Sequence, residues 1–487
     1  MFQYALDAWQ NESAGEQSLQ TLSKLGYSDT AQVQRWLELM RRAPAYARLN
    51  NSERDRVDAI IPDLLAAAAA CQDPDSTLRG CLNLVERLQQ WPGYLSVLVY
   101  PGMLQRLVGL VGASPWLAQF LYSHPELLDR LLGEQYLECL PSVDALRAAL
   151  LEDLSACAGD EAAEMIALRK FKHNHVLHIV SLDLEGLINL DEVSKALSDL
   201  ADLLLGCVVQ RVSGRMGLGR NAPLGIIAYG KLGSREMTYS SDTDIVFVYD
   251  ERGDVSETVL ARLARSVNHW LTEPTAAGVL YATDFRLRPH GESGLLVGSI
   301  SAFSEYQRKH AWTWEHQALT RARWIAGDEA LCAQFQSIRR EMLLRERDGT
   351  QLSAEVVAMR ERIEQSKLAE NDQFNVKHSR GGIIDVEFAV QHLVLRHARL
   401  HPELVMSTDN ESILTAAARI GLIPAHLAGE VALAFRLYRS WMHRERLRGN
   451  ETILVSPRQA EPHRDAVLAL WRHSFESSEM TSAALAA

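Results

Sequence analysis

Residues 229–247 read YGKLGSREMTYSSDTDIVF, a glycine-rich turn followed by two acids and an apolar run. The acids Asp242 and Asp244 stand two positions apart at the start of that run, which is expected to form a strand. Both carboxylates should therefore project from one face, while Ile245 and Phe247 face the opposite side. Two adjacent carboxylates repel each other unless a cation lies between them. An isolated acid pair is usually a solvated strand end, but the glycines and serine before this one and the apolar strand after it favour a divalent-cation site.

A third acid stands in the apolar stretch from Val279 to Leu287, which is also expected to be a strand. Strand alternation would place Asp284, Arg286 and Arg288 on one face, where a carboxylate and two guanidinium groups suit a metal-bound triphosphate. Mg²⁺ is the expected cation, because it takes oxygen ligands and is often shared between carboxylates and substrate phosphates. Transfer of a phosphate-bearing group to an acceptor oxygen then needs little covalent chemistry from the protein, which has to position ions, neutralise charge and align the attacking oxygen.

Around these segments the hydrophobic pattern changes twice along the chain. The expected elements are, in order, helices from Ser18 to about Val212, strands at Leu224–Tyr229 and Ile245–Tyr249, a helix at Glu257–Leu271, the strand at Val279–Leu287, a glycine-rich loop at His290–Gly298 and helices from Ile300 to the end. The fold class is therefore α+β and mostly helical. The predicted domains are residues 1–139, residues 140–330 (a helical lead-in over 140–213 and the sheet over 214–330) and residues 331–487.

Composition and charge restrict the class of protein. The chain has 487 residues, 47% of them hydrophobic and 23% charged, an ordinary globular composition with room for about two to four domains. Its formal net charge of -12 has the wrong sign for holding a nucleic acid across a broad face, so no nucleic-acid partner is expected. The six cysteines are scattered, and no apolar run approaches the roughly 20 residues that a membrane span needs. A soluble cytoplasmic protein with no membrane partner is expected.

At the acids the sequence resembles the nucleotidyltransferases of the DNA polymerase beta type, whose signature is Gly-Ser, an acid pair before a strand and a third acid on a later strand. Within that superfamily it is most similar to glutamine synthetase adenylyltransferase, also called adenylyltransferase/removase. The blocks that carry the resemblance are Gly230–Gly233, Tyr239–Asp244, Asp284–Gly294, Ala311–Arg323, and Lys377 followed by Gly381–Phe388. Two positions depart from the family pattern: Ser234 stands where a second glycine is common, and Thr243 where an aliphatic residue is usual.

The resemblance implies transfer of AMP from ATP to a tyrosine of glutamine synthetase, with release of pyrophosphate and down-regulation of that enzyme in nitrogen metabolism. It also implies a polymerase-beta-type sheet flanked by helical domains, with two Mg²⁺ ions that Mn²⁺ can replace. The implied catalytic and metal-binding residues are Asp242, Asp244 and Asp284, with Asp284 nearest the attacking tyrosine oxygen. The implied ligands of the ATP phosphates are Lys231, Gly233, Ser234, Arg286 and Arg288.

The proteins of this family are about twice as long and carry a removing module followed by an adding module. The blocks found here resemble the adding module, so the chain is expected to add AMP and to lack the removing module. The resemblance also implies regulation by a PII-type signal protein and by glutamine. The helical region before the catalytic module, residues 1–139, is expected to receive the PII signal.

Three further features have plainer explanations. In the segment His173–His178 only the second and third histidines share a helix face, and no third metal ligand is evident. Gly214–Gly219 has the glycines of a dinucleotide-binding loop but the reverse order of strand and helix, so a hinge is the better interpretation. Asp385 and Glu387, just after a pair of glycines, are expected to brace the active site.

The block Ala311–Arg323 is expected to be helical, with both aromatic and basic positions. Core packing explains Trp312 and Trp314 better than stacking on a base does. For Arg321 and Arg323 a role in binding phosphate stays open.

Two rival functions are disfavoured. A nucleotidyltransferase that modifies RNA or a small molecule does not suit the net acidity or the family blocks. A regulatory protein that senses nitrogen status and has lost catalysis does not suit the intact set of three acids. An assay with radiolabelled ATP separates the active enzyme from the inactive regulator.

Overall fold

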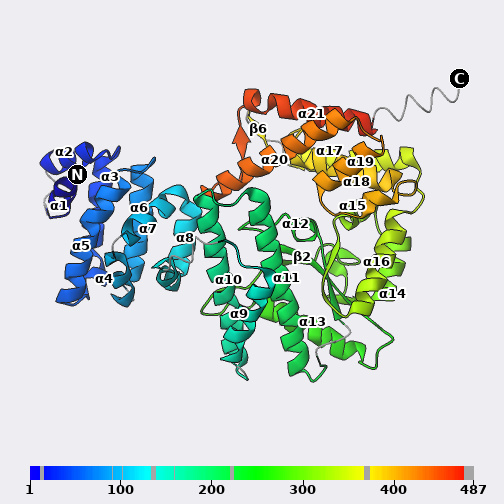
Figure 1. Cartoon of the computed structure of the whole chain (residues 1–487), viewed down its shortest axis with the longest axis horizontal. Helices are drawn as coiled ribbons and strands as arrows, with labels where there is room; N and C mark the ends of the chain where they lie inside the picture. The colour runs from blue at the N-terminus through cyan, green and yellow to red at the C-terminus, as the bar shows by residue number, and fades with distance from the viewer. Residues whose placement is uncertain are drawn as a thin grey trace. The chain divides into compact units, whose positions relative to one another are not determined.

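In the computed structural model of the chain, the described residues are 1–10, 16–89, 92–100, 102–132, 139–157, 159–219, 224–366 and 373–475 (Figure 1). The chain folds into two compact units. The first unit comprises Met1–Leu140, His173–Asn189 and Arg444–Glu451, and the second comprises Pro141–Lys172, Leu190–His443 and Thr452–Ala487. The sheet belongs to the second unit, as do the helices that follow it in sequence, except for the end of α20 (Ala425–Leu447), whose residues from Arg444 onward belong to the first unit.

The first unit is built from helices, as the periodicity predicted. Before residue 140 they are α1 (Phe2–Gln10), α2 (Glu16–Leu25), α3 (Thr30–Arg42), α4 (Pro44–Ala47), α5 (Asn51–Ala68), α6 (Pro74–Leu88), η1 (Pro92–Val99), α7 (Met103–Ala113), α8 (Pro115–Ser123) and η2 (Pro125–Leu132). Capping residues mark the N-termini of several of these helices. Asn50 and Glu53 form a capping box at α5, and Asp73 is the N-cap of α6, whose first residue is a proline.

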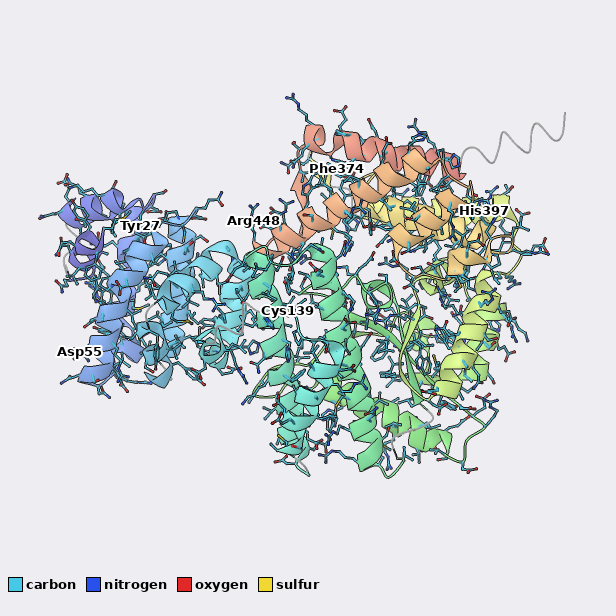
Figure 2. All side chains as sticks on the ribbon, in the orientation of Figure 1. Tyr27, Asp55, Cys139, Phe374, His397 and Arg448 are labelled. Carbon is cyan, nitrogen blue, oxygen red and sulfur yellow. The ribbon has the colours of Figure 1, made fainter. Side chains whose placement is uncertain are left out.

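The core of the first unit also buries polar side chains that have a partner. Tyr27, labelled in Figure 2, is buried, and its hydroxyl donates a hydrogen bond to the backbone oxygen of Leu65 at 2.8 Å.

Among the described residues no single helix is long and apolar enough to cross a membrane. The bent pair Gly93–Val99 and Met103–Ala113 is long and apolar enough only when its two helices are taken together.

Along the sequence, the helices of the second unit lie before, between and after the strands of its sheet. They include α9 (Val143–Ser155), α10 (Glu161–Leu184, whose residues from His173 onward belong to the first unit), α11 (Leu190–Arg215), α13 (Glu257–Thr272), α14 (Ile300–Lys309), α15 (Thr313–Thr320), α16 (Glu329–Leu343), α17 (Gly349–Ser366), α18 (Ile383–His397), η5 (Pro402–Val405), α19 (Asn410–Arg419), α20 (Ala425–Leu447) and α21 (Pro457–Phe475). Ile227 and Val246 of the sheet share one hydrophobic core with Phe335 of α16 and Val390 of α18. The sheet and the later helices therefore fold around a common core.

Within the described residues the main sheet has five strands. They are β1 (Leu224–Ala228), β2 (Thr243–Tyr249), β3 (Thr283–Asp284), β4 (Val297–Ser299) and β5 (Arg323–Gly327). β1 runs antiparallel to β2 and β5, and β2 runs parallel to β3 and β4. Gly225 of β1 is needed because Trp324 of β5 packs over it: a Cβ there would lie 1.8 Å from the indole ring. A second, two-stranded sheet pairs β6 (Phe374–Asn375) with β7 (Leu454–Val455).

Two predictions about strands are wrong. The expected strand from Val279 to Leu287 is reduced to Thr283–Asp284, because the backbone N–H of Arg286 donates to Asp284 Oδ1 at 2.8 Å and turns the chain. The expected helical region after Ile300 is interrupted by β5, which adds an edge to the sheet. A five-residue strand between two helices leaves too short a pattern for periodicity to separate it from them.

Candidate active site

The three predicted acids lie together at the start of two paired strands. Asp244 on β2 is the register partner of Asp284 on β3, and Asp242 directly precedes β2. Burial, followed by the negative charges of Asp242 and Asp284, raises the pKa of Asp244 to about 6. The structure therefore brings the acids close enough to repel one another electrostatically, which is the arrangement that a bound cation relieves.

Thr243, which departs from the family pattern, has a clear local role. Its side chain is fully buried, its backbone N–H donates to the oxygen of Ala282 at 2.9 Å, and its hydroxyl donates to the same oxygen at 3.0 Å. A β-branched side chain is well suited to a strand, and the hydroxyl is satisfied where an aliphatic residue would make no hydrogen bond. Thr243 thus helps to hold the segment that carries Asp284 against β2.

Asp284 is engaged by its neighbour. Arg286 donates to its carboxylate through the backbone N–H at 2.8 Å, through Nε at 2.7 Å and through Nη2. The side-chain hydrogen bond from Arg286 is the main reason that the pKa of Asp284 lies below its ordinary value. The guanidinium of Arg286 is largely exposed and also feels the charges of Asp244 and Asp242. Arg286 therefore belongs to the acid cluster.

Neither Arg286 nor Arg288 lies on a strand with Asp284, which corrects the predicted strand face shared by the three residues. The guanidinium of Arg288 donates to three backbone oxygens, those of Gly294 at 3.1 Å, Glu292 at 2.9 Å and Phe285 at 3.3 Å. The strand ends at Asp284, so alternation does not continue to residue 288. Arg288 holds the loop that follows in place.

The glycine turn between β1 and β2 forms the short helix α12 (Gly230–Gly233). Gly230 has a φ of 53°, and a Cβ at this position would lie 2.3 Å from Asp244 Oδ2, so the turn approaches the acid more closely than another residue allows. The backbone N–H of Gly233 donates to Tyr229 O at 2.8 Å, and that of Ser234 donates to Gly230 O at 3.1 Å. Both backbone amides thus donate within the turn, while the Lys231 side chain is exposed beside it.

Behind this turn lies a buried arginine whose role the sequence left open. Arg321 donates to Ser234 Oγ at 2.6 Å, forms an ion pair with Glu236, and forms another with Glu387 of α18 at 2.5 Å. Burial alone lowers the pKa of Arg321, but the charges of Glu387 and Glu236 raise it above its ordinary value. Arg321 is therefore a permanent cation that fixes Ser234.

Arg323, the other basic residue of that block, is also committed. Its guanidinium binds both carboxylate oxygens of Asp202, at 2.8 and 2.9 Å, and donates to Leu232 O at 2.9 Å. Arg321 and Arg323 thus hold the turn from behind. The sequence shows that both residues are basic, but it does not indicate which carboxylates and backbone oxygens they bind.

The remaining candidates are two tryptophans, Asp385 with Glu387, and the segment Gly214–Gly219. Trp312 and Trp314 are 70% and 37% exposed, so the expectation that they pack in the core is wrong: α15 starts after Trp312 and buries other side chains. Asp385 is fully buried, forms an ion pair with Arg360 and accepts from the backbone N–H of Gly381 at 2.6 Å, so it holds the start of α18, and neither of these partners belongs to the acid cluster. Glu387, the other residue expected to brace the site, contacts the turn through Arg321. Gly214 lies in the last turn of α11 (Leu190–Arg215), and the next strand along the described chain is β1, so a helix precedes the strand as the sequence indicated. The hinge role of Gly214–Gly219 stays a prediction.

Two family models match separate parts of this chain. Residues 104–338 match the family model of glutamate-ammonia ligase adenylyltransferase, and residues 351–452 match that of GlnD PII-uridylyltransferase. Proteins named bifunctional glutamine synthetase adenylyltransferase/adenylyl-removing enzyme are similar over nearly the whole chain. The one from Aromatoleum aromaticum is 42% identical over 98% of this chain and 51% of its own length. The one from Chromobacterium violaceum is 43% identical over 95% of this chain and 52% of its own length.

The chain spans about half the length of these relatives. The matched family model covers the acids Asp242, Asp244 and Asp284 together with the turn and Arg321. Residues 104–338 of this chain are therefore similar to the glutamate-ammonia ligase adenylyltransferase family.

Proposed function

We propose that this chain transfers AMP from ATP to a tyrosine hydroxyl of glutamine synthetase and releases pyrophosphate. The observation that carries the proposal is the register of β2 with β3, which sets Asp244 beside Asp284 and places Asp242 at the same end of the sheet. The names of the relatives support the substrate, since they describe adenylyltransferases of glutamine synthetase. The net charge of -12 disfavours RNA as an alternative acceptor.

Two Mg²⁺ ions, which Mn²⁺ can replace, are the proposed cofactors, with Asp242, Asp244 and Asp284 as their protein ligands. The donor set fits: all three groups are hard carboxylate oxygens, and Asp244 is held in a field of like charge that a cation relieves. When bound, the cations supply charge neutralisation for the phosphates and lower the pKa of the acceptor hydroxyl.

The chain's own residues then bind the ATP phosphates and orient the tyrosine hydroxyl. Arg286 is proposed to leave Asp284 and bind the phosphates, together with Lys231 at the exposed side of the turn. While Arg286 is bound to it, Asp284 is a weak base, because its pKa is lowered. Transfer of the guanidinium to phosphate frees an oxygen of Asp284, which can then accept a hydrogen bond from the tyrosine hydroxyl and afterwards its proton. Gly233 and Ser234 contribute by shaping the turn that closes on Asp244.

Direction and regulation are further parts of the proposal. The acid site adds AMP and does not remove it with phosphate, since the blocks around it resemble the adding module. A PII-type signal protein and glutamine are proposed to regulate the reaction. The match of residues 351–452 to GlnD PII-uridylyltransferase supports a link to PII signalling, and the helices of residues 1–139 are the proposed receiver of that signal.

The experiment is to incubate the chain with α-labelled ATP, Mg²⁺ and unmodified glutamine synthetase. Label is expected on glutamine synthetase and on no RNA added in its place. The same chain is then given adenylylated glutamine synthetase with phosphate and a PII-type protein, where no ADP is expected. Label on RNA alone would refute the substrate, and rapid ADP formation would refute the direction.

A further inference from the structure

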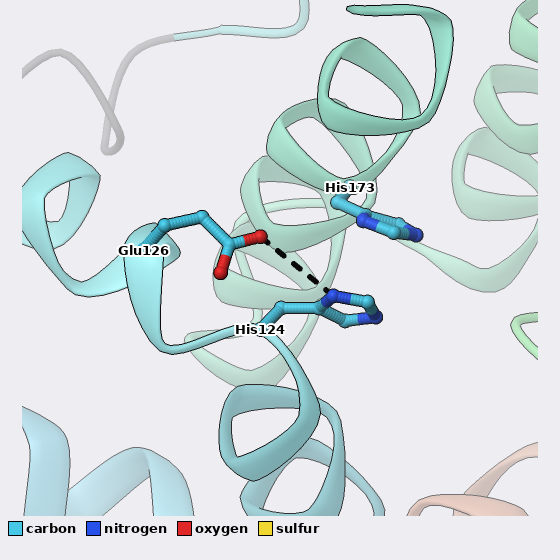
Figure 3. Close-up of side chains that lie close together, drawn as sticks. All are labelled: His124, Glu126 and His173. Atoms are coloured by element: carbon cyan, nitrogen blue, oxygen red, sulfur yellow. Dashed lines mark ion pairs between the residues drawn. The ribbon is translucent and has the colours of Figure 1, made fainter. Parts of the chain in front are cut away.

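A second group of metal-binding side chains lies in the first unit, outside the acid site. His124 follows α8, Glu126 lies in the first turn of η2, and His173 lies on α10 (Figure 3). Each offers one ligand atom, and these atoms all lie within 4.8 Å of one another. The group could not be found by spacing, because His173 lies on a different helix face from the other two histidines of its segment, and its partners stand 47 and 49 residues earlier in the chain.

The carboxylate of Glu126 faces the two imidazole rings. Glu126 Oε1 lies 3.7 Å from His124 Nδ1, and Figure 3 shows the ring of His173 stacked against that of His124. The ring centroids are 3.7 Å apart and the planes are inclined at 35°. An ion pair with Glu126 needs only one imidazole, that of His124. Here the imidazole of His173 also lies close to the same carboxylate.

Local packing holds the rings in this place. The ring of Phe120 meets both imidazoles edge-on, with centroids 5.1 Å from His124 and 5.6 Å from His173. The His173 side chain is buried, while those of His124 and Glu126 are 15% and 33% exposed. One wall of the group is therefore fixed in the core and the other is open to solvent, so an ion can enter and keep a water ligand.

We propose that His124, Glu126 and His173 bind one Zn²⁺ ion. Two imidazole nitrogens and one carboxylate oxygen form a three-residue ligand set that suits Zn²⁺ and leaves the fourth position to water. Mg²⁺ prefers all-oxygen sites, so the acid site and this site select different ions by ligand chemistry. Zn–N bonds of about 2.0–2.1 Å lie in the ring plane, so one imidazole has to rotate out of the stack when the ion binds.

Such an ion would join α10 to the segment between α8 and η2. Because the unfolded chain does not present these ligands together, binding of the ion stabilises the folded first unit. The site is independent of AMP transfer, since none of its residues belongs to the acid cluster or the turn. It is therefore tested by binding and by stability, without an activity assay.

The test uses the full chain, freed of metal by a chelator and kept in excess Mg²⁺ to occupy the acid site. Zn²⁺ is titrated against a chromogenic zinc chelator, and Co²⁺ is added separately to record its visible absorption. One Zn²⁺ per chain is expected, together with an intense Co²⁺ spectrum typical of four-coordination. His173→Gln, His124→Gln and Glu126→Gln should each weaken Zn²⁺ binding by at least the roughly 10–100-fold that loss of an outer-shell partner causes. His178→Ala, on the same helix, should leave binding unchanged.

Thermal unfolding of the same samples shows whether a variant is folded and whether Zn²⁺ still stabilises it. Zn²⁺ should raise the Tm of the parent chain and of His178→Ala, and it should leave the Tm of Glu126→Gln, altered at a partly exposed side chain, unchanged. Absence of a stoichiometric Zn²⁺ site in the parent chain would overturn the proposal. Equal Zn²⁺ affinity in the parent chain, His173→Gln and Glu126→Gln would do the same.

Discussion

The guanidinium of Arg321 donates a hydrogen bond to the hydroxyl of Ser234 over 2.6 Å, which ties the residue after α15 to the end of the glycine turn. Its other side pairs with Glu387, so the turn beside Asp244 is braced from α18. Since α18 belongs to the core shared with the sheet, a displacement of that helix should be felt at the turn. A substitution behind the turn should therefore alter the acid site without touching an acid.

Arg321→Met should destabilise the second unit by about 3–5 kcal/mol, because it leaves the buried carboxylate of Glu236 without its cation. Glu387→Gln keeps the side-chain volume and removes one charge, so it should destabilise the protein less than Arg321→Met does. It should nevertheless change KM for ATP more than a surface variant does. Glu364→Gln, which breaks an ion pair with Arg380, is the matched control. Denaturant unfolding and steady-state kinetics measure the two effects; an unchanged Arg321→Met protein would show that the brace is unnecessary.

Gly230→Ala should abolish most of the AMP transfer while leaving a folded protein. The new Cβ would meet Asp244 Oδ2 at 2.3 Å, and a φ of 53° costs a non-glycine residue about 1–2 kcal/mol. Gly214→Ala is the control, because a Cβ there has no neighbour within 4 Å and lies in the helix α11. We expect Gly214→Ala to keep full activity and ordinary or slightly higher Tm. Full activity of Gly230→Ala would show that the turn does not approach the acid.

Asp244 should make the stability of the metal-free chain depend on pH. Its pKa in the folded protein, about 6, lies above the ordinary 3.8, so the folded state holds the proton more tightly than the unfolded state does. The associated stabilisation, about 3 kcal/mol, is present below pH 4 and is lost as the pH rises to 6. Asp244→Asn should remove this slope between pH 4 and 6. Urea unfolding at each pH measures it, and an identical slope in both proteins would contradict the cause.

Metal removal should stop the reaction. A chelator is expected to abolish AMP transfer, and Mg²⁺ or Mn²⁺ to restore it, because the proposed ligands are all carboxylate oxygens. Zn²⁺ alone should not restore transfer. Transfer that persists at full rate in the chelator, with metal content checked by mass spectrometry, would rule out metal catalysis.

The acid cluster was predictable because its signal is local. Asp242 and Asp244 stand two positions apart at the start of one strand, where alternation places them on one face. Asp284 lies in a second apolar segment, and the resemblance to the nucleotidyltransferases groups it with the pair. Alternation failed immediately beyond Asp284, where the side chain bonds to the backbone N–H of Arg286 and ends the strand. A pattern of residue types does not report such a bond.

The contacts that hold the turn were not predictable from the sequence. Arg321 lies 85 residues from Glu236 and 66 residues from Glu387, and only the tertiary fold brings these charges together. The tryptophans at the start of α15 show a different failure: large aromatic residues are usually buried, yet Trp312 lies exposed at the N-cap of the helix.

The most direct test of the central claim is the intact mass of glutamine synthetase after incubation with this chain, ATP and Mg²⁺. Three enzymes are compared: the parent chain, Asp242→Asn, and Asp250→Asn, which alters an acid at the far end of the same strand. We predict that the parent and Asp250→Asn add one AMP per subunit, and that Asp242→Asn is slower by at least about a hundredfold although it remains folded. AMP addition by Asp242→Asn at the parent rate, or no addition by the parent, would contradict the account.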